Sequence, residues 1–188
     1  MSADVTRAAQ SVARGALVLY PTDTLYGLGT DATNPRALDR LLEAKDRPAN
    51  MPISVAVSST EEAELLVDWT PPARALARTL LPGPVTLLVR ASALARRRLA
   101  PPLIAPDGTL GVRVPDHPIA RELARQAGPL TATSANRHGE PPAASVAAAR
   151  RIFGDRVATY LTEGPIPSGR PSTLVDLRGP TPRFVERR

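Results

Sequence analysis

Short apolar segments of the β-strand type alternate with helical patterns along the whole chain of 188 residues. The segments that predict strands are residues 17–20, 25–29, 53–57, 85–90, 110–114, 130–134, 157–161, 173–177 and 184–185. Between them, apolar residues at helical spacing predict helices over residues 4–14, 35–45, 61–66, 73–81, 118–127 and 145–153. This interleaving favours a single α/β (mixed α+β) domain over residues 1–188, with one mixed β-sheet flanked by helices on both faces.

One segment interrupts the pattern. Residues 92–108 contain several prolines and three consecutive arginines at 96–98. Because proline removes a backbone donor and fixes its own backbone, we predict an exposed excursion here. An arginine triplet usually forms a solvated surface, and contact with nucleic acid is the alternative.

The composition is that of a globular protein, with 43% hydrophobic and 22% charged residues. The sequence has no cysteine, which excludes disulfides, thiolate metal ligands and a cysteine nucleophile. No apolar run approaches the ~20 residues of a membrane span, and residues 1–14 lack the apolar stretch of a signal peptide. We therefore expect a cytoplasmic enzyme without membrane contact. The net charge of +6 suits a polyanion, either nucleotide phosphate or RNA.

The first strand leads into a loop with the composition of a binding site. Its apolar run stops at Pro21, the polar residues 22–24 follow, and Gly27 and Gly29 come next. Loops on rigid scaffolds carry many binding groups, and glycines let the main chain turn or approach a ligand closely. A strand followed by an ordinary Asx-type turn is the alternative.

Lys45 is the only lysine among 24 basic residues, and Arg47 follows it two positions later. On an extended segment both side chains point the same way. They could then bind a polyphosphate, with the lysine ammonium as a compact charge and the arginine guanidinium donating two parallel hydrogen bonds. The alternative is that both cations interact with the C-terminal end of the preceding helix dipole.

Three further positions place polar groups on strands that otherwise consist of apolar residues. Arg113 lies within such a strand, and an unpaired buried arginine is so costly that it must meet either a ligand anion or an internal carboxylate. Residues 131–136 end another strand in hydroxyl groups, with Ser134 and Asn136 two positions apart. Ser172 opens a third strand. Ligands often bind at strand ends in a sheet covered by helices, and turn chemistry is the alternative reading of Ser134 and Asn136.

Several other kinds of site are not supported by the sequence. His117 and His138 lack the spacing of metal ligands and favour surface or structural roles. There is no Walker-type glycine loop and no dinucleotide fingerprint. A nucleotide would therefore bind here in an unconventional way.

Six of these segments together resemble the threonylcarbamoyl-AMP synthase family, whose members contain a YrdC-like domain. The matching motifs, in the family's order, are Pro-Thr-Asp-Thr-Leu-Tyr-Gly-Leu-Gly at 21–29, Lys45-x-Arg47-Pro48, residues 82–86, residues 111–115, Ser134-x-Asn136 and residues 171–173. They span nearly the whole chain. The length resembles the short single-domain form, and the presence of both spaced pairs favours the synthase over the related YciO-type proteins.

The resemblance implies a twisted mixed sheet between helices, with a positively charged concave face. It also implies an enzyme that joins L-threonine, bicarbonate and ATP into threonylcarbamoyl-AMP and pyrophosphate. Downstream threonylcarbamoyl transferase proteins would pass the product to an adenosine of tRNA, and direct tRNA contact is possible. The carbamate's own oxygen attacks phosphorus in such a reaction, so alignment and charge neutralisation replace a protein nucleophile.

The family's roles carry over by motif. Thr24, Arg113 and Ser172 are expected to hold threonine, with Arg113 binding its carboxylate. Lys45 and Arg47 are expected to neutralise the triphosphate as pyrophosphate leaves.

The nucleotide contacts are carried over in the same way. Ser134 and Asn136 are expected to contact the α-phosphate or the ribose. Thr109 and Arg187 are further nucleotide candidates. Mg²⁺ is expected to accompany ATP, although no carboxylate pair in the sequence marks a dedicated site.

Two departures from the family pattern keep alternatives open. Met51 stands where many members carry a polar residue, and His138 replaces a residue that is usually small. One alternative is a related nucleotide-binding enzyme with a different amine substrate. The other is a non-catalytic RNA-binding protein, which the shortage of aromatic residues for base stacking argues against.

Overall fold

A computed structural model of the chain describes residues 3–186, which form a ten-stranded mixed sheet with helices around it. The strands are β1 (Leu17–Pro21), β2 (Tyr26–Gly29), β3 (Ser54–Ala56), β4 (Val67–Asp68), β5 (Val85–Ala91), β6 (Thr109–Arg113), β7 (Leu130–Ser134), β8 (Val157–Tyr160), β9 (Thr173–Asp176) and β10 (Arg183–Val185). Their order is β10-β9-β5-β6-β3-β7-β2-β1-β8, and β4 pairs with β5. The pairs β1–β8, β3–β6 and β5–β9 are parallel, whereas the pairs β1–β2 and β5–β6 are antiparallel. The predicted mixed α/β fold is confirmed.

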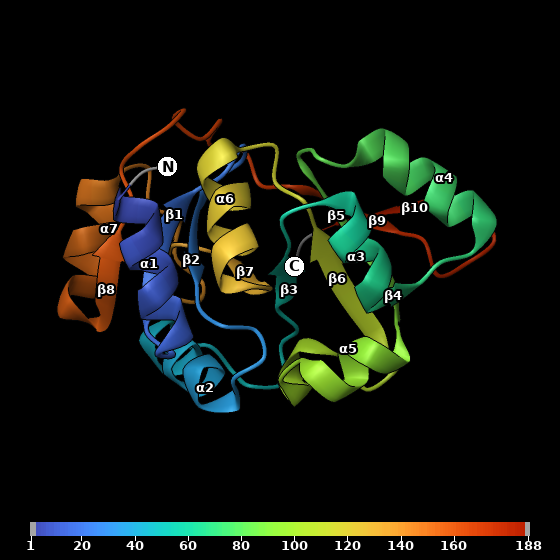
Figure 1. Cartoon of the computed structure of the whole chain (residues 1–188), viewed down its shortest axis with the longest axis horizontal. Coiled ribbons are helices and arrows are strands. Elements are labelled where there is room, and N and C mark those ends of the chain that lie inside the picture. The colour runs from blue at the N-terminus through green and yellow to red at the C-terminus, as the bar shows by residue number, and fades with distance from the viewer. Residues whose placement is uncertain (1–2, 187–188) are drawn as a thin grey trace.

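The helices begin where the sequence supplies capping side chains. They are α1 (Ala3–Ala13), α2 (Pro35–Ala44), α3 (Thr60–Leu66), α4 (Pro71–Leu80), α5 (Ala93–Arg98), α6 (Pro118–Ala127) and α7 (Val146–Phe153), with short 3-10 turns η1 (Pro101–Leu103) and η2 (Gly154–Arg156). The side chains of Asn34, Ser59 and Ser145 each accept a hydrogen bond from the first turn of the helix that follows. Figure 1 shows α1 and α6 side by side in front of β1 and β2, with α3, α4 and α5 grouped around the other half of the sheet.

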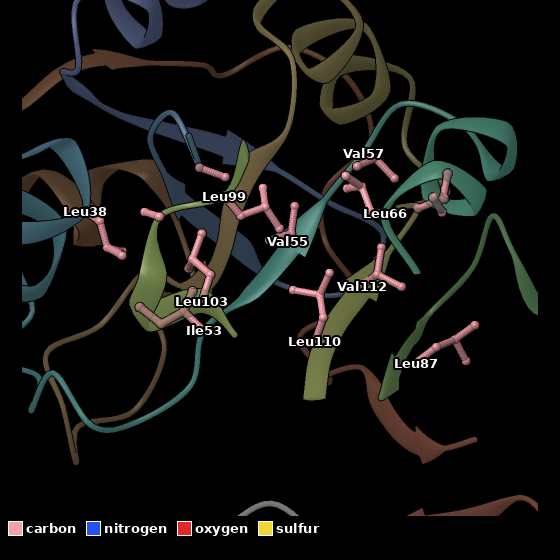
Figure 2. Close-up of a cluster of buried hydrophobic side chains, with 14 of the residues drawn as sticks. Leu38, Ile53, Val55, Val57, Leu66, Leu87, Leu99, Leu103, Leu110 and Val112 are labelled. Atoms are coloured by element: carbon pink, nitrogen blue, oxygen red, sulfur yellow. The ribbon is translucent and has the colours of Figure 1, made fainter. Parts of the chain in front are cut away.

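Two apolar clusters cover opposite faces of the sheet. On β1, Leu17 and Leu19 belong to the larger cluster, whereas Val18 and Tyr20 belong to a smaller one built with α1 and α6. This division follows from the two-residue alternation of a β-strand. Figure 2 shows the larger cluster, in which strand residues such as Val55 and Val112 pack near residues from the helices.

The prediction for residues 92–108 is wrong. This segment forms α5 and η1, and Leu99 and Leu103 are buried in the larger cluster (Figure 2). Ser92 caps α5 by accepting a hydrogen bond from the backbone N–H of Ala95. The three consecutive arginines hid an amphipathic segment, in which the arginines at 96–98 face solvent while Leu99 and Leu103 face the core. The short strand β4 also escaped prediction.

The glycines of β2 leave room for the ring of Tyr20, and Gly27 also lines the cavity described below. A Cβ atom added to Gly27 would lie 2.8 Å from Cζ of Tyr20, and one added to Gly29 would lie 2.7 Å from Cε1 of the same ring. The ring therefore lies across both glycines from the neighbouring strand. Its hydroxyl donates a hydrogen bond to the carbonyl oxygen of Thr131, 3.2 Å away. Burial raises the pKa of Tyr20 to about 12.

Candidate functional site

A cavity of about 1140 Å³ opens over the face of the sheet that points away from the larger cluster. On β6, Leu110 and Val112 enter that cluster, so the alternate positions of this strand line the cavity. The predicted site residues that line it are Thr24, Arg47, Thr109, Arg113, Ser134, Asn136 and Ser172. Segments far apart in the sequence therefore meet at one cavity. The candidate Arg187 lies outside the described residues.

Arg113 anchors one end of this cavity. Its Nη2 atom lies 2.7 Å from Oδ1 of Asp23, and its Nη1 atom donates a hydrogen bond to Oγ1 of Thr24 over 3.1 Å. The Arg113 residue is only 8% exposed. Burial lowers the pKa of its guanidinium, while the charge of Asp23 acts in the opposite direction. The internal ion pair is thus present, and the same arginine also faces the cavity.

Four hydroxyl groups line the same cavity as Arg113. Oγ1 of Thr22 lies 2.9 Å from Oγ1 of Thr24, and Oγ of Ser172 lies 2.8 Å from Oγ1 of Thr86. All four residues are buried and line the cavity. Together with Arg113 they form an end of the cavity suited to a small anion that also carries hydrogen-bond donors.

Lys45 takes a conformation different from the expected one. It is the C-cap of α2 with φ −92° and ψ −4°, and Asp46 has a positive φ of 50°. The segment is therefore not extended, and the two cations do not project as a parallel pair. Nζ of Lys45 donates hydrogen bonds of 2.5 Å to the carbonyl oxygens of Ser134 and Asn136.

The burial of Lys45 has an electrostatic consequence. The residue is 1% exposed. Desolvation, with a smaller effect from the nearby charge of Arg47, lowers its pKa from 10.5 to about 7. Its backbone carbonyl also accepts a hydrogen bond from the N–H of His138 over 2.7 Å. Lys45 therefore holds the turn at 134–138 in place through both its side chain and its backbone carbonyl.

Arg47 faces the cavity. Its Nη2 atom donates a hydrogen bond to the carbonyl of Pro52 over 3.0 Å, and its Nε atom is buried without a hydrogen-bond partner among residues 3–186. Burial lowers its pKa. Met51 lies beside it on the cavity wall. A buried N–H group without a partner favours binding of an anion at this position.

Ser134 and Asn136 face the cavity from the turn that Lys45 holds. Oγ of Ser134 donates to Oδ1 of Asn136, and Nδ2 of Asn136 donates to the carbonyls of Arg137 and Glu140. The donors of both side chains are thus used within the turn. The oxygen of Ser134 remains able to accept a hydrogen bond.

Sequence reasoning missed Arg178, which closes the far end of the cavity. It forms two hydrogen bonds to the carboxylate of Asp176, one to Asp107 and one of 2.5 Å to Oγ1 of Thr109. These carboxylates raise its pKa further above the usual value. Residues 172, 174, 176 and 178 lie at every second position along β9 and just beyond it, so they are expected to share one face of the strand. This spacing from Ser172 is the signal that could have predicted Arg178 as a site residue.

His117 has the structural role that was expected, but it is not at the surface. It is 1% exposed, and Nε2 lies 3.0 Å from the carbonyl of Pro165. A carbonyl oxygen can only accept, so Nε2 donates this bond, and burial lowers the pKa of the ring. The loop at 162–171 is also held by the N–H of Gly169, which donates to the carbonyl of Thr24 over 2.9 Å. Ser172 follows directly after this loop.

Under the activity that the sequence resemblance implies, His117→Leu is expected to raise the KM for L-threonine about tenfold while changing the KM for ATP less than twofold, because the loop leading to Ser172 loses one of its attachments. Steady-state kinetics of pyrophosphate release measure both constants. His117→Gln keeps a donor near Pro165 and serves as the matched control. Equal changes in both KM values for His117→Leu would contradict this assignment.

The comparisons with known proteins agree on one family. The family model of the Sua5, YciO and YrdC proteins, described as "Telomere recombination", matches residues 10–187. This chain belongs to the Sua5/YciO/YrdC family. A Chromohalobacter salexigens protein named threonylcarbamoyl-AMP synthase is 42% identical over 182 residues, covering 93% of this chain and 92% of that protein.

Solved structures of the Sua5/YciO/YrdC family show the same fold. The structure of Pyrococcus abyssi Sua5 complexed with L-threonine is 33% identical, with a TM-score of 0.87, and the match covers 96% of this chain. The chain spans about half of that protein, since the match covers 52% of it. Escherichia coli YciO, at 24% identity and a TM-score of 0.84, shares the fold.

The described part of the chain has neither a metal-binding cluster nor a membrane-spanning helix. In residues 3–186, no three or more His, Cys, Asp or Glu side chains are grouped so that they could hold a metal ion. No helix in the same range is long and apolar enough to cross a membrane.

Proposed function

We propose that the chain is a threonylcarbamoyl-AMP synthase, which converts L-threonine, bicarbonate and ATP into threonylcarbamoyl-AMP and pyrophosphate. The observation that carries this proposal is the placement of two cationic groups on one cavity, Arg113 among hydroxyl groups and Arg47 beside the turn at 134–138. The likeness to a threonine-bound Sua5 structure and to a protein named for this activity supports it.

Each end of the cavity suits one substrate. Arg113 binds the carboxylate of threonine through a charge-assisted hydrogen bond, with Thr24 and Ser172 beside it. Arg47 binds the triphosphate of ATP. Thr109 lies four residues before Arg113 on β6, about 13 Å away along an extended strand, and suits the adenosine part. Strand β6 therefore binds threonine near Arg113 and adenosine near Thr109. The reacting atoms of the two substrates can then meet between these two positions.

The turn at 134–138 suits the ribose better than the α-phosphate. The donors of Ser134 and Asn136 are used within the turn, so Ser134 can accept a hydrogen bond from a ribose hydroxyl. Lys45 contributes by holding this turn, because its Nζ atom donates hydrogen bonds to the carbonyls of Ser134 and Asn136. Arg187 is kept as a candidate contact to the adenylate.

The reaction follows from alignment of the substrates. The amine of threonine attacks the carbon of bicarbonate and forms a carbamate with loss of water. A carbamate oxygen then attacks the α-phosphorus, and the bond to the β-phosphate breaks, so pyrophosphate leaves with the electron pair. Arg47 stabilises the charge that develops on the leaving group. Mg²⁺ bound to the phosphates of ATP would supply further charge neutralisation.

We also propose where the chain acts and which proteins use its product. The protein is a single domain that acts in the cytoplasm, and the adenylate passes to downstream threonylcarbamoyl transferase proteins that modify tRNA. Direct contact with tRNA would use the arginine-rich surface that includes residues 96–98.

The deciding experiment measures pyrophosphate release with ATP, L-threonine and bicarbonate, omitting each in turn. Release is expected only with all three present, together with a threonylcarbamoyl-AMP product by mass spectrometry. The variant Arg47→Ala is expected to lower kcat/KM for ATP at least 100-fold, and Arg151→Ala on the exposed side of α7 is the matched control. Release supported by another amine but not by L-threonine would contradict the assigned substrate.

A further inference from the structure

Two segments meet at the phosphate end of the cavity, namely the loop after α2, which carries Arg47, and the turn at 134–138. Besides the hydrogen bonds of Lys45, one ion pair joins these segments. Nη1 of Arg137 lies 3.1 Å from Oδ2 of Asp46. Neither Arg137 nor Asp46 is part of the cavity wall that the described residues form. Any effect of this pair on a bound ligand must therefore pass through the two segments that it joins.

The backbone at Asp46 completes the end of helix α2. The N–H of Asp46 donates to the carbonyl of Glu43 over 3.1 Å. The N–H of Arg47 donates to the carbonyl of Leu42 over 3.0 Å. With the positive φ of 50° at Asp46, these bonds form a Schellman motif, in which the residue after the C-cap takes the left-handed conformation. This motif fixes the direction in which the chain leaves the helix, and Arg47 is the next residue.

Aspartate is an unfavourable residue at this position. Glycine is the usual choice, because a side chain in the left-handed conformation is strained. Asp46 is the one residue other than glycine with a positive φ in residues 3–186. Its negative charge also lies at the C-terminal end of the helix dipole, where a cation is favoured. The contact with Arg137 needs the carboxylate, which glycine does not have, so this locally unfavourable choice points to a role for the contact.

We infer that the ion pair between Asp46 and Arg137 positions Arg47 for the triphosphate of ATP, by joining its loop to the turn at 134–138. This inference rests on the proposed function. Asp46 directly precedes Arg47, so a carboxylate held by Arg137 limits the movement of the loop that carries Arg47. Asp46 and Arg137 are positioning residues, because they act on the phosphates only through Arg47 and the turn.

The pair also changes the electrostatics near the phosphates. An unpaired carboxylate next to Arg47 would repel the triphosphate and compete for the guanidinium that binds it. Arg137 compensates this charge. Both side chains are exposed, at 41% for Arg137 and 61% for Asp46. Because exposed ion pairs contribute little to folding, removal of this pair is expected to change ATP binding and to leave stability nearly unchanged.

The test compares ATP, inorganic triphosphate and adenosine as ligands, with dissociation constants measured by NMR titration. Asp46→Gly removes the carboxylate and keeps the left-handed conformation. This variant is expected to bind ATP and inorganic triphosphate about three- to fivefold more weakly, while its affinity for adenosine stays within about twofold of the wild type. Its Tm is expected to be no lower than that of the wild type. Arg137→Glu places two carboxylates near Arg47 and is expected to weaken binding of both phosphate ligands at least tenfold.

A charge exchange and a control keep the test decisive. Asp46→Lys combined with Arg137→Asp restores an ion pair of opposite direction, and it is expected to recover most of the ATP affinity that Arg137→Asp alone loses. The matched control is Arg78→Glu, which reverses a charge in the exposed ion pair with Glu64 and is expected to leave ATP binding unchanged.

Three results would overturn the inference. If Asp46→Gly and Arg137→Glu bind ATP as tightly as the wild type, the pair does not position Arg47, and the proposed function stands. If Asp46→Gly loses affinity for adenosine and inorganic triphosphate equally, the pair acts on the whole cavity and not on Arg47. A wild-type protein that binds neither ATP nor inorganic triphosphate would overturn both the inference and the proposed function.

Discussion

Arg113→Met is expected to lower the free energy of unfolding by about 3–5 kcal/mol and to abolish threonine-dependent release of pyrophosphate. The loss of stability arises because the largely buried carboxylate of Asp23 loses its ion-pair partner. One carboxylate oxygen of Asp23 is already buried without a partner among residues 3–186. Urea denaturation measures the first effect, and steady-state kinetics measure the second.

A double variant separates folding from substrate binding. Asp23→Asn with Arg113→Met removes both charges and is expected to recover most of the lost stability, because no unpaired charge remains buried. It should not recover threonine binding, since the cation that binds the carboxylate is still absent. A double variant that regained threonine-dependent activity would show that Arg113 acts only through the fold.

The elements of the fold could be predicted where local signals agree. Asn34 followed by Pro35 marks the start of α2, and the structure shows that cap. The prediction of an exposed excursion at residues 92–108 was wrong because it relied on their prolines and arginines. The burial of Leu99 and Leu103 depends instead on neighbours distant in sequence. Tertiary packing decided this segment.

The candidate site was predictable only where the motif contains the functional side chain itself. Thr24, Arg113 and Ser172 were expected, and all three line the cavity. Asp23 and Arg178 were not selected, because their importance comes from partners on other strands. Asp23 pairs with a residue 90 positions away, and Arg178 reaches Thr109 across 69 positions. Such pairings depend on the order of strands in the sheet, which periodicity does not reveal.

Lys45→Met is expected to raise the KM for ATP at least tenfold, because the turn that carries Ser134 and Asn136 loses its attachment. A buried carbonyl left without a donor costs about 1–3 kcal/mol. The variant removes the Lys45 donor from the carbonyl of Asn136, while the carbonyl of Ser134 keeps the backbone N–H of Asn136. The threonine end of the cavity lies on other segments, so the Kd for L-threonine should change less than twofold. Lys45→Gln retains a donor and should have an intermediate effect.

The effect of Lys45→Met on the free energy of unfolding is expected to depend on pH. The pKa of Lys45 is about 7 in the fold, against 10.5 for the ordinary side chain. Between these values the unfolded chain binds a proton that the folded chain has released, so stability rises with pH across this window. The difference in unfolding free energy between the wild type and Lys45→Met should therefore grow from pH 6.5 to pH 9. A difference that stays constant over this range would mean that Lys45 remains fully protonated in its buried position, and that its charge is balanced by the turn it holds.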